Sequence, residues 1–263
     1  MLEKLDLSKQ MSKEEFKLKM PPLQSRLGEL QRQCRELKVP VMIAFEGFDA
    51  AGKGFHIGRL IQSLDPRGFS VYTMQEETKE ERMYPFLWRF WTKTPAGGRI
   101  AIYDGSWYRK VLTERFEKNT KKSKLSEQYE SIRTFERQLS DDGTVIIKLL
   151  LVIDKKEQKK RFRKLGENKE TAWRVDKGDL ERNAHYGTYR CMMEEMLLKT
   201  DDTYAPWTLV EAMDKRYATV KIYERVIAVL EEAVLNVARR QQENEGAAKA
   251  GETVTQKDVQ AED

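Results

Sequence analysis

The sequence predicts an α/β fold in which a parallel β-sheet is covered by helices on both faces. Three observations support this prediction. Short apolar segments rich in β-formers alternate with longer segments of helical spacing, one apolar segment leads directly into a glycine-rich loop, and that loop leads directly into a helix. Parallel strands are joined by crossover connections, usually helices, so this alternation is the order expected for such a sheet.

Five apolar runs bounded by turn residues are expected to be strands, and they cover residues 39–46, 69–74, 98–104, 145–154 and 205–213. Five segments with apolar residues at three- and four-residue steps are expected to be helices, and they cover residues 23–37, 52–64, 80–93, 125–139 and 214–240. Pro21 and Pro22 are expected to separate the first of these helices from the charged residues before it.

Composition divides the chain into an N-terminal extension at residues 1–22, one domain at residues 23–240 and a disordered acidic tail at residues 241–263. The tail holds six acidic and two basic residues, so the total formal charge of +5 combines a body of +9 with a tail of −4. A basic body indicates an anionic partner, and nucleic acid, a membrane surface and a phosphate-rich small molecule are the candidates.

Composition also excludes several classes of protein. The two cysteines, Cys34 and Cys191, are far apart, which rules out a disulfide framework or a cysteine zinc site and suits the reducing cytoplasm. The two histidines, His56 and His185, make a histidine-rich metal site improbable. No apolar run reaches the roughly 18 residues that span a bilayer, and the first twenty residues lack the apolar stretch of a signal peptide.

The strongest local pattern is the segment GFDAAGKG at residues 47–54, which has the spacing G-x-x-x-x-G-K between a strand and a helix. Such a loop turns backbone N–H groups inward, and the helix N-terminus adds partial positive charge. A tight turn without a ligand is the alternative interpretation. The residues expected to bind phosphate are Gly47, Ala50, Ala51, Gly52, Lys53 and Gly54, and Lys53 adds a full charge.

Two aspartates are candidate metal ligands. Gly54 stands where a serine or threonine commonly offers its hydroxyl to Mg²⁺, and Asp49 in the loop is a plausible substitute. Asp104 ends a predicted strand, at the edge of the sheet where ligands bind in open α/β folds. The pair is expected to hold Mg²⁺, or one of them to orient the acceptor. The alternative interpretations are a turn or capping residue for Asp49 and a strand-end turn for Asp104.

Six motifs together resemble the type 2 polyphosphate kinases, which include the polyphosphate:AMP phosphotransferases. They are FEGFDAAGKG (45–54), PFLWRFW (85–91), GRIAIYDGSWY (98–108), VLTER (111–115), AWRVDKGD (172–179) and YAPWTLVEAMDKRYA (204–218). The resemblance runs from about residue 23 to residue 240. It implies a P-loop kinase fold similar to that of thymidylate kinase, with three α/β/α layers, a parallel sheet and a helical lid at about residues 155–200.

The resemblance implies phosphoryl transfer between inorganic polyphosphate and a nucleoside mono- or diphosphate (AMP, ADP or the guanine equivalents), dependent on Mg²⁺ with Mn²⁺ as an alternative. It also implies a homo-oligomer. The cysteine usage predicts a cytoplasmic protein, and no nucleic-acid or membrane partner is expected, since the basic excess comes without a recognition motif for nucleic acid. The roles carried over are catalysis for Asp49, Lys53 and Asp104, metal binding for Asp49 and Asp104, phosphate binding for Arg59, Lys110 and Arg115, and lid contacts for Arg174 and Lys177. The basic run at 155–174, with nine basic and three acidic residues, forms the first part of this lid and suits a polyanion, and a solvated helix face is the alternative interpretation of the run.

One departure from the family pattern affects the expected activity. The family reads Asp-Arg-Ser-Trp-Tyr, whereas this chain has Gly105 directly after Asp104. An arginine at a transferring phosphoryl group contributes strongly to catalysis, so its absence favours a second hypothesis. The protein is then a weakly active or inactive module that binds polyphosphate or nucleotide. Arg109 or Lys110 would supply the missing charge from one turn away.

Overall fold

The structure, a computed structural model, describes residues 1–118 and 121–259. Its five strands form one parallel sheet in the order β2-β3-β1-β4-β5. The strands are β1 (Val41–Gly47), β2 (Phe69–Thr73), β3 (Ile100–Asp104), β4 (Val145–Val152) and β5 (Trp207–Glu211). All five predicted strands and the parallel sheet are confirmed, with ends that differ by at most two residues.

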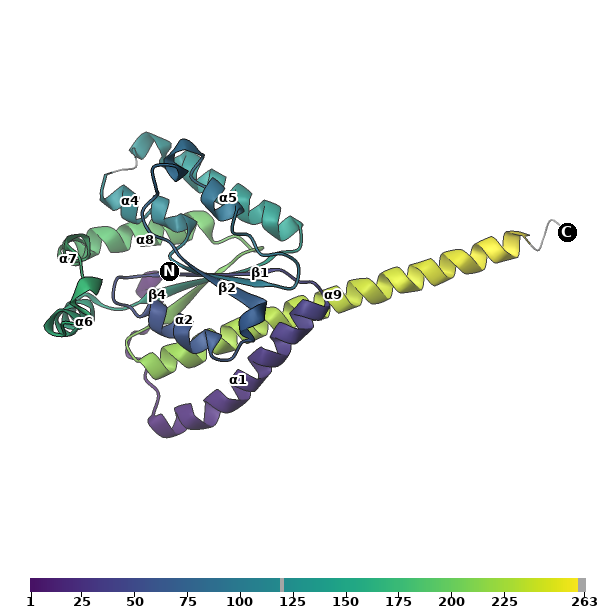
Figure 1. Cartoon of the computed structure of the whole chain (residues 1–263), viewed down its shortest axis with the longest axis horizontal. Helices are drawn as coiled ribbons and strands as arrows, with labels where there is room; N and C mark the ends of the chain where they lie inside the picture. Colours follow the sequence, from purple (N-terminus) through teal and green to yellow (C-terminus); the bar gives the residue numbers. More distant parts are fainter. Residues whose placement is uncertain (119–120, 260–263) are drawn as a thin grey trace.

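Helices cover both faces of the sheet, as Figure 1 shows. The helices α1 (Lys13–Glu36), α2 (Lys53–Ile61) and α9 (Lys215–Val259) lie on one face, and α4 (Thr113–Phe116), α5 (Leu125–Asp141) and α8 (Tyr186–Thr200) lie on the other. Two further helices, α6 (Lys155–Glu167) and α7 (Lys177–Ala184), lie at one end of the sheet, and α3 is the single turn Trp88–Trp91. The predicted three-layer α/β/α arrangement is therefore confirmed.

The central strand β1 is the most buried element of the fold. All seven of its residues are buried, and β3 and β4 flank it on either side. A strand covered on both faces reads as a continuous apolar run, which is the pattern of this segment. In the sheet, β3 and β2 lie on one side of β1, and β4 and β5 lie on the other. The loop after β1 therefore lies at the point where the strand order reverses, which is where ligands bind in open α/β sheets.

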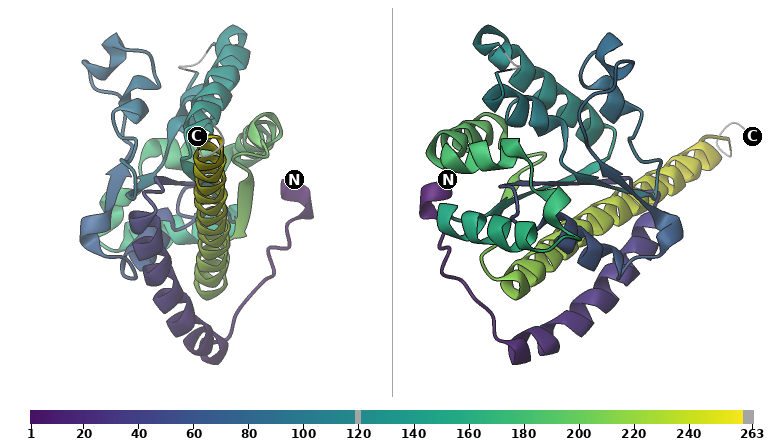
Figure 2. Two further views of the ribbon diagram at one scale, coloured as in Figure 1. Left: turned by 90° about the vertical axis from the view of Figure 1, so that its right-hand side faces the viewer. Right: turned by 60° about the vertical axis from the view of Figure 1, so that its left-hand side comes forward.

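The predicted helix break at Pro21 and Pro22 is wrong, because α1 runs through both prolines without interruption. Each proline removes a helical hydrogen bond, at a cost of about 3 kcal/mol. Packing overrides this cost, since α1 lies against α9 (Figure 2) and buries Met20 and Leu27 in the core. The start of the chain joins the same body, where the N-terminal amine pairs with Glu194 on α8.

The predicted helix at residues 80–93 is also wrong. The segment contains a 3₁₀ turn at Glu81–Met83 and the single turn of α3, with Tyr84 extended between them (φ −111°, ψ 161°). Pro85 accounts for the interruption, because the residue before a proline is sterically pushed out of the helical region.

The C-terminal helix α9 continues to Val259, beyond the predicted end of this helix at residue 240, and residues 260–263 lie outside the described part. The segment is rich in Ala, Glu, Gln and Lys, which favour helix, and extending an existing helix needs no new nucleation. Figure 1 shows this end projecting from the body. No helix in the described part of the chain is both long and apolar enough to cross a bilayer.

The predicted lid at residues 155–200 divides into two parts. Helix α8 belongs to the body, since Tyr189, Met193 and Met196 are buried in the core. Helices α6 and α7, with a 3₁₀ turn at Ala172–Arg174 between them, form the outer part. We call residues 155–184 the lid segment.

Candidate active site

The loop between β1 and α2 has the backbone conformation of an anion-binding turn. Gly47, Ala50 and Gly52 have φ values of 144°, 57° and 105°. At Gly47 a side chain is excluded by packing, since a Cβ there would lie 2.3 Å from the Leu151 carbonyl oxygen. Ala50 adopts a left-handed conformation that non-glycine residues rarely take. Nine-residue helix α2 begins at Lys53 and leaves its first N–H groups without helical partners, which suits a phosphate.

The predicted phosphate-binding residue Ala51 has its backbone donor engaged within the turn. The N–H group of Ala51 donates to the Phe48 carbonyl oxygen at 3.0 Å, and the N–H group of Phe48 donates to the Leu151 carbonyl oxygen at 3.1 Å. The tight turn uses these two donors internally, so they are not directed at a ligand. The remaining predicted loop residues, Gly47, Ala50, Gly52, Lys53 and Gly54, follow one another from the end of β1 into α2.

Asp104 lies beside the start of α2, as the sequence predicts. It pairs in register with Phe45 on β1, and its Oδ2 would lie 3.7 Å from a Cβ placed on Gly54. Both Lys53 and Asp104 act electrostatically on the buried carboxyl group of Glu46. The prediction that Asp104 and the loop converge is therefore confirmed.

Glu46 is a residue of this site that the sequence interpretation missed. Its carboxylate accepts hydrogen bonds from the N–H group and hydroxyl of Ser106, at 2.6 and 2.7 Å. Burial raises the pKa of the Glu46 carboxyl, although the charge of Lys53 and the bonds from Ser106 oppose that rise. Glu46 thus ties the turn after Asp104 to the strand before the loop. An acidic residue ending an otherwise apolar run was the available signal.

Asp49 does not stand alone in the loop. Its Oδ2 accepts a hydrogen bond of 2.7 Å from Nε of Arg182 on α7, and its backbone carbonyl accepts one of 3.1 Å from Gln158 on α6. Arg182 is 133 residues away in the chain, so no local pattern could reveal the pair. The lid segment therefore reaches Asp49 through Arg182 and Gln158, and not through the predicted lid residues Arg174 and Lys177.

Arg161 on α6 binds the backbone of the loop between β1 and α2, and the sequence interpretation missed this residue as well. Its guanidinium donates to the carbonyl oxygens of Ala50 (3.1 Å) and Ala51 (3.0 Å), and to those of Ala212 (2.7 Å) and Met213 (3.0 Å) after β5. Its Nε donates to Glu157 at 2.8 Å. One side chain thus joins the phosphate loop, the lid segment and the end of the sheet.

The carboxylates of Asp49 and Asp104 fit a hard cation such as Mg²⁺, which binds through one or two carboxylates, several waters and substrate phosphates. In the described part of the chain, no three His, Cys, Asp or Glu side chains converge as a closed metal site. His56 is not a candidate ligand, because its buried ring contacts the Thr219 hydroxyl at 3.1 Å. Magnesium binding by Asp49 and Asp104 therefore stays a prediction.

The remaining predicted contacts have mixed outcomes. Lys110 and Arg115 follow β3 but pair with Glu114 and Glu195, each at 2.8 Å. Arg59 is not brought to the loop, because its guanidinium donates to Gln62 at the far end of α2. The lid residues Arg174 and Lys177 are both exposed, and Arg174 lies over the Trp173 ring.

Gly105 adopts a conformation that suits glycine, with φ at +74°. Its N–H group donates to the Phe45 carbonyl oxygen at 3.0 Å, and a Cβ there would lie 3.8 Å from Met74. Nearby, Nε of Arg109 is buried and has no hydrogen-bond partner among the described residues. Arg109 and Ser106 line the same small cavity, so a guanidinium stands close to the turn where the family arginine is missing.

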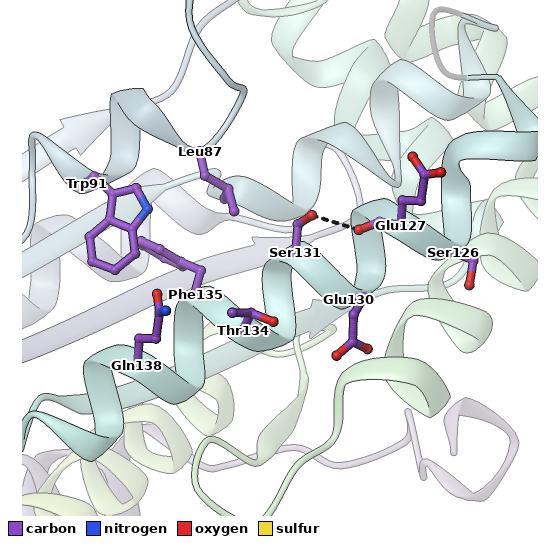
Figure 3. A pocket seen from close by; sticks show the side chains of 9 residues that line it. All are labelled: Leu87, Trp91, Ser126, Glu127, Glu130, Ser131, Thr134, Phe135 and Gln138. Atoms are coloured by element: carbon purple, nitrogen blue, oxygen red, sulfur yellow. Dashed lines mark hydrogen bonds between the residues drawn. The ribbon is translucent and has the colours of Figure 1, made fainter.

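A larger pocket of about 660 Å³ opens between α3 and α5, and Figure 3 shows its side chains. Trp91 and Phe135 meet edge to face at one end, with ring centroids 4.7 Å apart. The carboxylates of Glu127 and Glu130 line the other part, which disfavours a polyanion. None of the predicted site residues lines this pocket, so it is separate from the phosphate loop.

Comparison with known proteins decides the family. A family model described as "Polyphosphate kinase 2 (PPK2)" matches residues 10–238. The chain belongs to the polyphosphate kinase 2 family. The resemblance predicted from the motifs is confirmed, and the match begins 13 residues earlier than the predicted start at residue 23, in agreement with the unbroken α1.

Relatives within the polyphosphate kinase 2 family share the fold. The polyphosphate:AMP phosphotransferase of Pseudomonas syringae pv. tomato is 37% identical over 233 residues, which cover 89% of this chain and 47% of that protein. A structure titled as a putative polyphosphate kinase 2 from Pseudomonas aeruginosa superposes with a TM-score of 0.85 at 37% identity, covering 88% of this chain and 50% of that one. Polyphosphate kinase 2 from Arthrobacter aurescens gives a TM-score of 0.84 at 28% identity, with 88% and 85% covered.

The chain spans about half the length of the first two of these relatives. It covers 85% of the Arthrobacter aurescens structure, so the matched region corresponds to nearly the whole of that smaller member. The P-loop kinase-like α/β fold predicted from the sequence is confirmed by both structures.

Proposed function

We propose that this protein transfers phosphoryl groups between inorganic polyphosphate and a nucleoside mono- or diphosphate. The observation that carries the proposal is the arrangement of Lys53, at the start of α2, beside Asp104 and the phosphate loop. Relatives support the substrate class by their names, which include the GDP-polyphosphate phosphotransferase of Mycolicibacterium smegmatis, 32% identical over 205 residues. Another is the ADP-polyphosphate phosphotransferase 3 of Rhizobium meliloti, 30% identical over 206 residues.

Each part of the site has a role in this reaction. The loop backbone and Lys53 bind phosphate oxygens and hold the transferring group in line with the acceptor. Asp49 and Asp104 would hold Mg²⁺, which when bound neutralises charge on the phosphates. The lid segment excludes water and would direct transfer to the nucleotide in place of hydrolysis.

A transfer assay tests the proposal. The full chain is incubated with Mg²⁺, polyphosphate and each of AMP, ADP, GMP and GDP, and the expected result is a phosphorylated product with at least one of them. Lys53→Met and Asp104→Asn are each expected to lower the rate by about a hundredfold or more, with unchanged circular dichroism. Absence of product with all four nucleotides, from folded protein, would refute the proposal. Replacing Mg²⁺ by Mn²⁺ or by a chelator tests the metal requirement.

The second candidate function is a binding module with little turnover, and Gly105 is the observation that favours it. Calorimetric titration with polyphosphate separates the two candidates, since a module would bind without forming product. The same titration against duplex DNA and anionic vesicles tests the proposal that neither nucleic acid nor membrane is a partner.

Oligomeric state and cellular location complete the proposal. We propose a cytoplasmic homo-oligomer, as the family resemblance implies and as the absence of a membrane-spanning helix in the described residues permits. Light scattering coupled to size-exclusion chromatography tests the first part, and cell fractionation tests the second.

A further inference from the structure

Arg182 joins the lid segment to the loop through one carboxylate. Its Nε donates to Asp49 at 2.7 Å, its Nη2 donates to Asp179 at 2.6 Å, and its Nη1 lies 3.5 Å from an oxygen of Glu117. The side chain is only 7% exposed. Three carboxylates therefore surround a single buried cation, and one of them is the proposed metal ligand of the loop.

The position of Arg182 is fixed by its own helix. Asp176 and Asp179 form a capping box at the start of α7. At the other end, the Asn183 amide donates to the Gln158 side chain at 2.8 Å. Arg182 projects from this anchored turn, so its contact with Asp49 is built into the packing of α7 against α6.

An arginine keeps its charge at any pH that a folded protein tolerates. A divalent cation on Asp49 would place two positive charges beside that guanidinium, and like charges so close together repel strongly. Arg182 would keep an ion-pair partner if it lost Asp49, because Asp179, three residues earlier on α7, also pairs with it. Displacement would therefore not leave a buried charge without a partner, which is the costly outcome for a buried ion.

We infer that Arg182 is a positioning residue which competes with the divalent cation for the Asp49 carboxylate. The inference rests on the proposed role of Asp49 as a metal ligand. In the metal-free protein Arg182 holds Asp49 and ties α7 to the loop. Cation binding takes over the carboxylate and releases that contact, whereas α6 stays attached to the loop backbone through Gln158 and Arg161.

Mn²⁺ binding to the full chain, without nucleotide or polyphosphate, tests the inference by the loss of the free-ion electron paramagnetic resonance signal. Arg182→Met is expected to bind Mn²⁺ at least about fivefold more tightly than the unchanged protein. Arg182→Lys keeps the charge but loses the fork of donors, and it is expected to fall between the two. Arg26→Met removes a carboxylate ion pair between α1 and α9, and it is expected to leave Mn²⁺ affinity unchanged.

The outcomes separate the inference from the proposed function. Equal or weaker Mn²⁺ binding by both Arg182 variants, with unchanged thermal unfolding in at least one, would overturn the competition. Asp49→Asn is expected to abolish tight Mn²⁺ binding. If Asp49→Asn binds as well as the unchanged protein, the metal role of Asp49 is refuted, whatever Arg182 does.

Discussion

Replacing Arg161 by methionine tests whether α6 holds the phosphate loop in place. The substitution keeps an apolar stem of similar length but removes every donor. Four carbonyl oxygens lose a charged hydrogen-bond donor, two in the loop at Ala50 and Ala51 and two after β5 at Ala212 and Met213. Glu157 also loses one of its two ion pairs and keeps the one with Lys160.

The magnitude follows from these contacts. A hydrogen bond to a charged group contributes about 1.5–3 kcal/mol, and four would give about 6–12 kcal/mol if they were independent. They share one guanidinium, and the Arg161 side chain is 13% exposed, so water replaces part of the loss. Glu157 keeps Lys160 as a partner, so no buried charge is left unpaired, and we expect the free energy of unfolding to fall by about 3 kcal/mol.

Urea unfolding followed by circular dichroism measures this loss. With a slope near 3 kcal/mol per molar urea, the midpoint should fall by about 1 M. Arg163→Met is the matched control, because Arg163 lies on the same helix, is 76% exposed and forms an exposed ion pair with Glu167 at 3.7 Å. Its expected loss is below about 0.5 kcal/mol. A loss for Arg161→Met below about 1 kcal/mol, or equal to that of the control, would refute the idea that α6 supports the loop.

Three further predictions concern the core, the pH response and the departure from the family pattern. Lys148→Met leaves the buried carboxylate of Glu136 without its cation and should lower the free energy of unfolding, measured in urea, by about 3–5 kcal/mol. Lys148→Met combined with Glu136→Leu should recover most of that loss. A double variant no more stable than the single one contradicts this. Burial, with the charges of Lys215 and Arg161, lowers the pKa of His56 to about 3. In the unfolded chain His56 is protonated below about pH 6.5, whereas in the folded chain it stays neutral down to about pH 3. Stability therefore falls as the pH drops below 6.5. Between pH 7 and pH 4 the unchanged protein should lose about 3 kcal/mol more than His56→Gln, and equal losses contradict the assignment. Gly105→Arg should cost about 1–2 kcal/mol, because φ is +74° there, and should leave turnover within a fewfold; a tenfold gain in turnover would instead favour the binding-module hypothesis.

Sequence patterns predicted the parts of the fold that depend on short stretches of chain. The strands, α2 and α5 each show the periodicity of their own class, and the glycines of the loop mark a turn that their spacing defines. Prediction failed where packing between distant segments decides the structure. The passage of α1 through Pro21 and Pro22 depends on α9, about 200 residues away, and no local preference reveals it.

The residues of the candidate site divide in the same way, into those that a local motif reveals and those that depend on contacts between distant segments. Lys53 and Asp104 could be predicted because each lies at the end of a strand or the start of a helix in a recognisable motif. Arg161 and Arg182 could not, because they reach the loop from 110 or more residues away. In the sequence they stand among many other basic residues, and only the fold separates them from the solvated ones such as Arg163.

The bonds of Arg161 and Asn183 determine which part of the lid segment is free to rearrange. Arg161 fastens α6 to the loop and to the end of β5, and Asn183 fastens the last turn of α7 to α6. Helix α6 and the last turn of α7 are therefore held in place relative to the sheet. A change in shape that admits a long phosphate chain must then be confined to residues 168–181, a stretch of 14 residues that carries Arg174 and Lys177 at the surface.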